Sequence, residues 1–159
     1  MSKQHLNHKY VKIRRLMVAT GLLFVLYACT KKQTQMPIVG TWELISATTT
    51  EKDANFSTFD SRSRFIKIIN PTHFAFLNHS LRAKGDTSTG TFTAGGGTYT
   101  LVDSVYTERL DYYTDRKWEN NKFEFVLTLT GDTLTQKGIE KVAKLDIDRV
   151  ITETYKRVK

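Results

Sequence analysis

The nine residues KFEFVLTLT, Lys122 to Thr130, decide the fold class of this chain. The odd-numbered positions of the run hold phenylalanine or leucine, and the even-numbered positions hold lysine, glutamate, valine or threonine. This period of two is typical of a β-strand with one buried face. Asparagines precede the run and Gly131-Asp132 follows it, so turns are predicted at both ends.

Runs of β-branched and aromatic residues recur along the chain from Pro37 onward, and no segment has a convincing helical period. Many short strands separated by turns favour an all-β sandwich or an up-and-down barrel. The predicted strands are Gly40–Ala47, Ser63–Ile69, Thr72–Leu77, Ser88–Ala94, Gly97–Val102, Ser104–Leu110, Lys122–Thr130, Thr133–Gly138 and Lys141–Val158, the last as one strand or two.

Two polar segments without alternation, Thr48–Arg62 and Thr114–Asn121, are predicted to be loops. Long loops in a small domain serve as lids or mouths, or as mobile surface loops, and both interpretations stay open here. Gly95-Gly96-Gly97 lacks the strand-to-helix context of a phosphate-binding loop, so a hairpin or a barrel corner is predicted there.

The first 28 residues have the pattern of a lipoprotein signal peptide. Five basic residues and no acidic residue precede an apolar run over residues 16–28. Leu26-Tyr27-Ala28-Cys29 resembles the site at which bacterial lipoproteins are cut and lipidated. We therefore expect a signal peptide over 1–28, a lipidated Cys29 with a tether over 29–36, and one domain over 37–159. A plain secretory signal or an uncleaved anchor is the alternative.

The charge of the chain lies largely in this leader. The whole chain has a formal net charge of +8, but the residues from Cys29 onward contain 19 basic and 16 acidic residues, a net charge of +3. No clustered basic patch remains, so no nucleic-acid partner is expected. Acyl chains on Cys29 would make the membrane the partner. Because Thr30 rather than aspartate follows the cysteine, the periplasmic face of the bacterial outer membrane is the expected location. No protein partner is indicated.

Gly40-Thr41-Trp42 resembles the Gly-x-Trp opening of lipocalin-like barrels. Further fragments resemble a family of bacterial lipocalin-like domain proteins in the same order along the chain. They are Lys67–Phe74, Gly95–Tyr99, Tyr106–Glu108, Gly131–Leu134 and Glu153–Val158. The resemblance covers nearly all of the chain after the leader. It implies a single antiparallel up-and-down β-barrel of about 8–10 strands with an interior cavity, and it implies no reaction.

The resemblance also implies one structural pair. In such barrels the tryptophan of the first strand closes one end, and an arginine of the last strand packs across its face. Trp42 and Arg157 are the corresponding residues here. A desolvated cation–π contact of this kind contributes about 1–2 kcal/mol.

Strand parity places Tyr106 on the same face as Glu108, and Glu153 on the same face as Tyr155. Either face of each strand can point into the barrel, and the resemblance favours the face with Tyr106 and Glu108 and the face with Glu153 and Tyr155. The candidate ligand-binding residues are therefore His73, Tyr99, Tyr106, Glu108 and Glu153, which would orient the head of an otherwise apolar ligand. The alternatives are structural pairing of the two glutamates with Arg109, Arg157 or a tyrosine hydroxyl, and an acid/base pair.

No motif indicates a metal, a cofactor or a catalytic centre. His73 and His79 lack cysteine partners and a third zinc ligand, and Asp146-Ile147-Asp148 lacks the glycine and distal glutamate of a calcium loop. No nucleophile elbow is present. We expect no enzyme activity, with a hydrolase-like or isomerase-like activity as the remaining alternative.

The sequence therefore favours non-covalent binding of a small apolar or amphiphilic ligand in a barrel cavity. The alternative is a non-catalytic interaction or scaffold module whose barrel is filled by its own side chains, because barrels of about eight strands can be packed shut. An interior cavity of ligand size would favour the first interpretation, and a filled interior the second.

Overall fold

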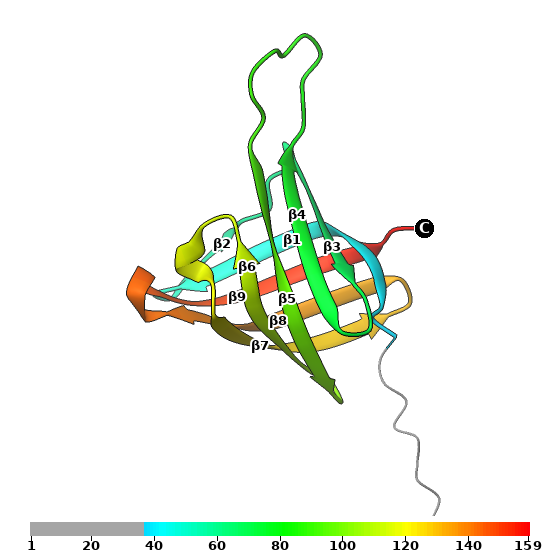
Figure 1. Ribbon diagram of the computed structural model, residues 1–159, viewed down its shortest axis with the longest axis vertical. Helices are drawn as coiled ribbons and strands as arrows, with labels where there is room; N and C mark the ends of the chain where they lie inside the picture. Colours follow the sequence, from blue (N-terminus) through cyan, green and yellow to red (C-terminus); the bar gives the residue numbers. More distant parts are fainter. Residues whose placement is uncertain (1–36) are drawn as a thin grey trace, which may run out of the picture. The chain divides into compact units, whose positions relative to one another are not determined.

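The computed structural model describes residues 37–159, which form a closed antiparallel sheet (Figure 1). Nearly all of these residues lie in strands or in the turns between them, and the helical segments are two single 3-10 turns. The elements are β1 (Gly40–Glu51), β2 (Ala54–Ser57), β3 (Ser63–Ile69), β4 (His73–Ser80), β5 (Phe92–Val102), β6 (Val105–Tyr113), η2 (Arg116–Trp118), β7 (Asn121–Thr130), β8 (Thr133–Val142), η3 (Ala143–Leu145) and β9 (Ile147–Arg157).

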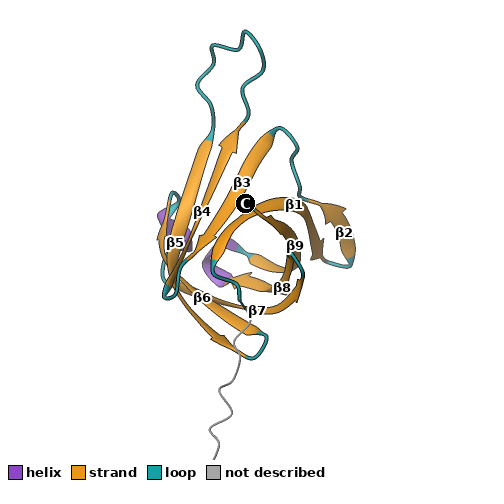
Figure 2. Cartoon of the chain, turned by 90° about the vertical axis from the view of Figure 1, so that its right-hand side faces the viewer, coloured by secondary structure: helices purple, strands orange, loops and turns teal. Residues whose placement is uncertain are grey.

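β1 pairs with β3, each strand from β3 to β8 pairs with the next along the chain, and β9 returns to pair with β1. This last pairing runs from Trp42 opposite Arg157 to Thr50 opposite Val150, and it closes the sheet around an interior (Figure 2). Eight strands form the barrel. β2 pairs with the far half of β1, outside the closed ring. The predicted all-β, up-and-down barrel is thereby confirmed.

β-Bulges change which residues of a strand face the interior. β1 has an irregular register between Leu44 and Ser46, where Ile45 is the extra residue and is exposed. Trp42 therefore points inward before the bulge, whereas Ala47 and Thr49 are buried after it. Because a bulge adds one residue to one strand, it reverses the inward and outward positions that follow.

The three consecutive glycines lie inside β5 and not in a turn, which corrects the prediction of two strands divided at Gly95-Gly96. β5 has a register shift against β6 between Gly96 and Gly97. A Cβ atom at Gly97 would lie 1.9 Å from the carbonyl oxygen of Arg109, so only glycine fits. The glycines thus allow the strand to bend tightly at a bulge.

Two further sequence predictions were wrong. The predicted loop Thr48–Arg62 contains the end of β1 and all of β2, which form a hairpin. The predicted strand Ser88–Ala94 begins only at Phe92, and an exposed loop over 81–91 projects from the barrel before it (Figure 1).

The other predicted loop, Thr114–Asn121, holds no strand before its last residue, and η2 lies within it.

The barrel end at which β1 begins is closed by side chains. Trp42 has no exposed surface, and its indole N–H donates a 2.7 Å hydrogen bond to the Ile38 carbonyl. The Arg157 guanidinium lies 4.0 Å from the centre of the Trp42 ring. Its two terminal nitrogens donate to the carbonyls of Val39 and Pro37. Trp42 and Arg157, the residues expected to pair, are therefore in contact. Arg157 also links the first residues of the domain to its last strand by hydrogen bonds.

The predicted signal peptide, the lipidated Cys29 and the tether lie outside the described residues, and these stay predictions. Within residues 37–159, no helix is long and apolar enough to cross a membrane.

Trp42→Ala is expected to lower the free energy of unfolding by about 3–5 kcal/mol, because it removes a fully buried indole from the closed end. Trp118→Ala is the matched control, since Trp118 is only partly buried at the other end of the barrel. Urea unfolding of both variants measures the difference. An equal loss from the two substitutions would contradict a closed end built around Trp42.

Candidate functional site

Two adjoining cavities lie toward the end of the barrel opposite Trp42. The inner cavity has a volume of about 260 Å³. Seven aromatic side chains and a group of hydrogen-bonded polar side chains line it. Its lining residues are Phe65, Lys67, Phe76, Glu108, Leu110, Tyr113, Trp118, Phe123, Phe125, Gln136, Glu140, Arg149, Ile151, Glu153 and Tyr155.

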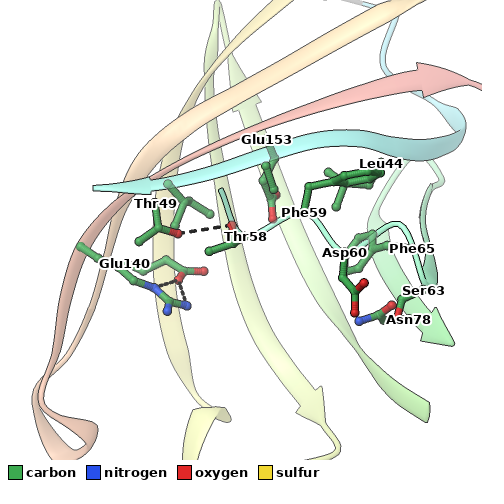
Figure 3. Close-up of a pocket in the computed structure, with 13 residues that line it drawn as sticks. Leu44, Thr49, Thr58, Phe59, Asp60, Ser63, Phe65, Asn78, Glu140 and Glu153 are labelled. Carbon is green, nitrogen blue, oxygen red and sulfur yellow. Dashed lines mark hydrogen bonds and ion pairs between the residues drawn. The ribbon is translucent and has the colours of Figure 1, made fainter. Parts of the chain in front are cut away.

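The rim cavity has a volume of about 270 Å³ and lies between the barrel and the segment that joins β2 to β3 (Figure 3). Its lining residues include Thr58, Phe59 and Asp60 from that segment, and Asn78 from β4. It shares five lining residues with the inner cavity: Phe65, Glu140, Arg149, Ile151 and Glu153. The two cavities therefore have a common wall from β3, β8 and β9.

The floor of the inner cavity is a hydrogen-bonded network centred on a buried lysine. The Lys67 ammonium donates to Glu108 Oε1 and to Gln136 Oε1, both at 2.8 Å. The amide nitrogen of Gln136 donates to Glu153 Oε2 at 2.8 Å, and the Tyr155 hydroxyl donates to the same oxygen at 2.6 Å. Four strands thus contribute to one chain of polar contacts, and buried polar groups of this kind need such partners.

Lys67 is almost completely enclosed, with 3% of its side chain exposed. Its ammonium lies between 5.5 and 5.8 Å from the ring centres of Phe74, Tyr106 and Tyr155. The faces of aromatic rings attract cations, so these rings and Glu108 together offset the cost of removing the charge from water.

Glu153 lies deep in the barrel, yet part of its side-chain surface is accessible because it lines both cavities. Burial raises the pKa of its carboxyl above the usual value, and the nearby Lys67 charge only partly counteracts this effect. Burial raises the pKa of Tyr155 as well, so Tyr155 is a neutral donor to Glu153.

An ion pair and an aromatic ring lie where the two cavities meet. Arg149 of β9 contacts Glu140 of β8 through two of its nitrogens, at 2.6 and 2.8 Å. The Arg149 guanidinium also lies 5.8 Å from the centre of the Trp118 ring. Both charged side chains are largely buried, with 31% and 16% of their surfaces exposed. Arg149 is therefore held by Glu140 and by Trp118.

The structure brings two of the five candidate ligand-binding residues to the cavities: Glu108 and Glu153. Their partners include Lys67, which was not foreseen, and the Tyr155 hydroxyl, which was one of the structural alternatives. Whether these carboxylates contact a ligand stays a prediction.

The other three candidates do not line either cavity. His73 is exposed, because Phe74 takes the inward position at the start of β4. The Tyr99 hydroxyl donates to the Asn70 carbonyl at 2.8 Å. Tyr106 packs against Tyr99 toward the closed end, with no exposed surface.

Two buried polar atoms in the described part of the chain lack a hydrogen bond: Asn78 Oδ1 and the Tyr106 hydroxyl. The Tyr106 hydroxyl lies near the Glu108 carboxylate, and burial together with that negative charge raises its pKa. Asn78 lines the rim cavity, but its Oδ1 atom is buried.

Sequence reasoning missed Lys67 and Gln136, which form the centre of the network. Strand parity was the signal that could have found them. Lys67 alternates with Phe65 and Ile69, and Gln136 follows Leu134 by two positions, so both share a face with residues that pack in the core. A charge on the apolar face of a barrel strand indicates an interior polar site.

The fold and the cavities define the class of this protein: a small closed antiparallel barrel with a partly open, partly polar interior. The chain belongs to the family described as a domain of unknown function (DUF4488), whose model matches residues 37–159. No curated protein matches the chain. Among residues 37–159, no group of three or more histidine, cysteine, aspartate or glutamate side chains is arranged to hold a metal ion.

Lys67→Met is expected to lower the free energy of unfolding by about 3–5 kcal/mol, because it leaves the Glu108 carboxylate buried without its cation. Adding Glu108→Gln should restore part of the loss, since the buried charge is then removed. Lys137→Met, on the exposed face of β8, is the control and should have little effect. A double variant no more stable than Lys67→Met alone would exclude the unpaired charge as the cause.

Proposed function

We propose that the protein binds a small amphiphilic molecule non-covalently in the inner and rim cavities. The observation that carries this proposal is the uneven filling of the barrel. Side chains fill the end at Trp42, whereas about 260 Å³ remains open above the Lys67 network, between aromatic walls. Barrels of about eight strands are wide enough to hold one small ligand when side chains do not fill them.

The size and lining of the cavities support a small ligand. Ligand pockets typically measure roughly 300–1,000 Å³ and combine apolar walls with a few placed polar groups. Each cavity here is slightly smaller than that range, and the two adjoin. A ligand that extends from one into the other would bury its apolar part among rings and place its polar part near Glu153.

The scaffold alternative is favoured by the closed end alone. A barrel that served only as a rigid support would gain stability if its interior were filled throughout, since empty space forfeits packing contacts. The open interior and the partly accessible Glu153 therefore favour binding over a support role. We propose binding rather than catalysis because the polar groups at the floor are occupied by one another.

The wider setting is part of the same proposal. We propose that the domain is related to lipocalin-like barrels, is attached to the bacterial envelope through lipid on Cys29, and faces the periplasm. The up-and-down barrel and the Trp42–Arg157 contact support the relationship, and the leader pattern supports the anchoring.

Cys29→Ser tests the anchor. The full chain is expected to carry acyl chains and to fractionate with membranes, and the variant is expected to lack the acyl chains because it has no thiol at position 29. Fractionation followed by intact-mass measurement tests both expectations. Masses that differ only by the substituted atom would rule out lipid on Cys29.

The cavity itself is tested with 4-phenylbutan-1-ol, a neutral probe with an apolar body. The chain has two tryptophans, and only Trp118 lines a described cavity. We therefore expect the probe to change tryptophan emission in the Cys29→Ser protein. The same change should persist in Trp42→Phe and disappear in Trp118→Phe.

A saturable change that survives in Trp118→Phe would place the binding site elsewhere. No saturable change, together with no uptake of the probe in a native mass spectrum, would favour the filled-barrel scaffold.

A further inference from the structure

We propose that the polar head of the ligand is a protonated amine that pairs with Glu153, while the apolar body lies among the aromatic rings of the inner cavity. This inference rests on the proposed binding function and adds the chemical class of the ligand. Three observations support it: the balance of charges around the cavities, the carboxylate oxygen of Glu153 that accepts no hydrogen bond within the described residues, and the aromatic lining.

Carboxylates outnumber cations around the two cavities. Four acidic residues line them, and only Lys67 and Arg149 are basic; the acidic residues are Asp60, Glu108, Glu140 and Glu153. An amine therefore meets attractive charge in these cavities, whereas an anionic head meets an excess of like charge.

Both cavity cations are already committed. Lys67 donates to Glu108 and to Gln136, and aromatic rings surround its ammonium. Arg149 is paired with Glu140 and lies over Trp118. To bind a carboxylate or phosphate head, either cation would have to give up a partner and leave a buried acid unpaired, which is costly.

Among the four cavity carboxylates, Glu153 is the one that forms no ion pair within the described residues. Asp60, Glu108 and Glu140 each form an ion pair, with Arg62, Lys67 and Arg149 respectively. The two hydrogen bonds of Glu153 come from neutral donors, Gln136 and Tyr155, and both reach the oxygen Oε2. The other oxygen, Oε1, has no hydrogen-bond partner in the described part of the chain and is free to accept from a ligand.

The position of Glu153 fits the same role. It lies in the wall common to both cavities, and Figure 3 shows its side chain extending from β9 into the space beside Thr58. Burial removes this carboxyl from water and thereby raises its pKa, and the negative charges of Glu140 and Glu108 add to the effect. An ammonium group at Oε1 would supply a compensating positive charge.

Six aromatic rings form a continuous series around the inner cavity. Each neighbouring pair has its ring centres between 5.5 and 6.5 Å apart, in the order Phe65, Phe76, Tyr113, Trp118, Phe123 and Phe125. All six line the inner cavity. Such rings bury an apolar body, and their faces also attract an ammonium group.

The test compares three probes that share one body and differ only in the head: 4-phenylbutylamine, 4-phenylbutan-1-ol and 4-phenylbutyrate. Affinities are measured at neutral pH by Trp118 emission and by titration calorimetry, with the Cys29→Ser full chain. We expect the amine to bind about tenfold more tightly than the alcohol, as a charge-assisted hydrogen bond implies, and the carboxylate to bind most weakly.

Glu153→Gln identifies the group responsible. In this variant the preference for the amine over the alcohol should disappear, and saturable binding of the alcohol shows that the cavity is still folded. Glu124→Gln removes one negative charge from the exposed face of β7 and should leave the preference for the amine intact.

The outcomes separate the two proposals. Equal binding of amine and alcohol, or tightest binding of the carboxylate, overturns the amine assignment and leaves ligand binding in place. A preference for the amine that persists in Glu153→Gln overturns the role of Glu153. Binding of none of the three probes contradicts both proposals.

Discussion

The pairing of β1 with β9 is the constraint on which the rest of this structure depends. Once these strands close the sheet, every second side chain points into a space without an exit through the wall. Apolar side chains fill that space near Trp42, whereas the polar ones, Lys67 and Glu108 among them, must find partners inside. The inner cavity lies next to this network, between aromatic rings.

Much of the barrel could be predicted from alternation. The bounds Ser63–Ile69 were predicted as observed, and the strand at Asn121–Thr130 to within one residue. The failures have physical causes. β2 escaped detection because all four of its residues are exposed, so burial imposes no pattern on it. The glycines of β5 were predicted to form a hairpin or a barrel corner, and the strand was divided there, because a bend inside a strand and a turn between strands demand the same residue.

The site could be predicted only in part. Strand parity correctly placed Glu108 and Tyr106 on one face, but parity does not determine how far along the barrel each residue lies. In the structure Tyr106 lies toward the closed end, and Glu108 lines the cavity. A β-bulge exchanges the inward-facing and outward-facing positions that follow it, and no sequence pattern marks where it occurs, as at Ile45. Contacts such as Lys67 with Gln136 join residues 69 positions apart, and no local pattern encodes them.

The hydrogen bonds that Arg157 donates to Pro37 and Val39 hold the first residues of the domain beside its last strand. The two ends of the domain lie side by side, and Val158 donates to the Thr41 carbonyl as well. A circular permutant, with its ends joined by a short peptide and new termini opened in the exposed 81–91 loop, would keep every strand next to its present neighbours. Folding of such a permutant would show that the order of the strands around the ring, and not the point at which the chain enters it, specifies this barrel.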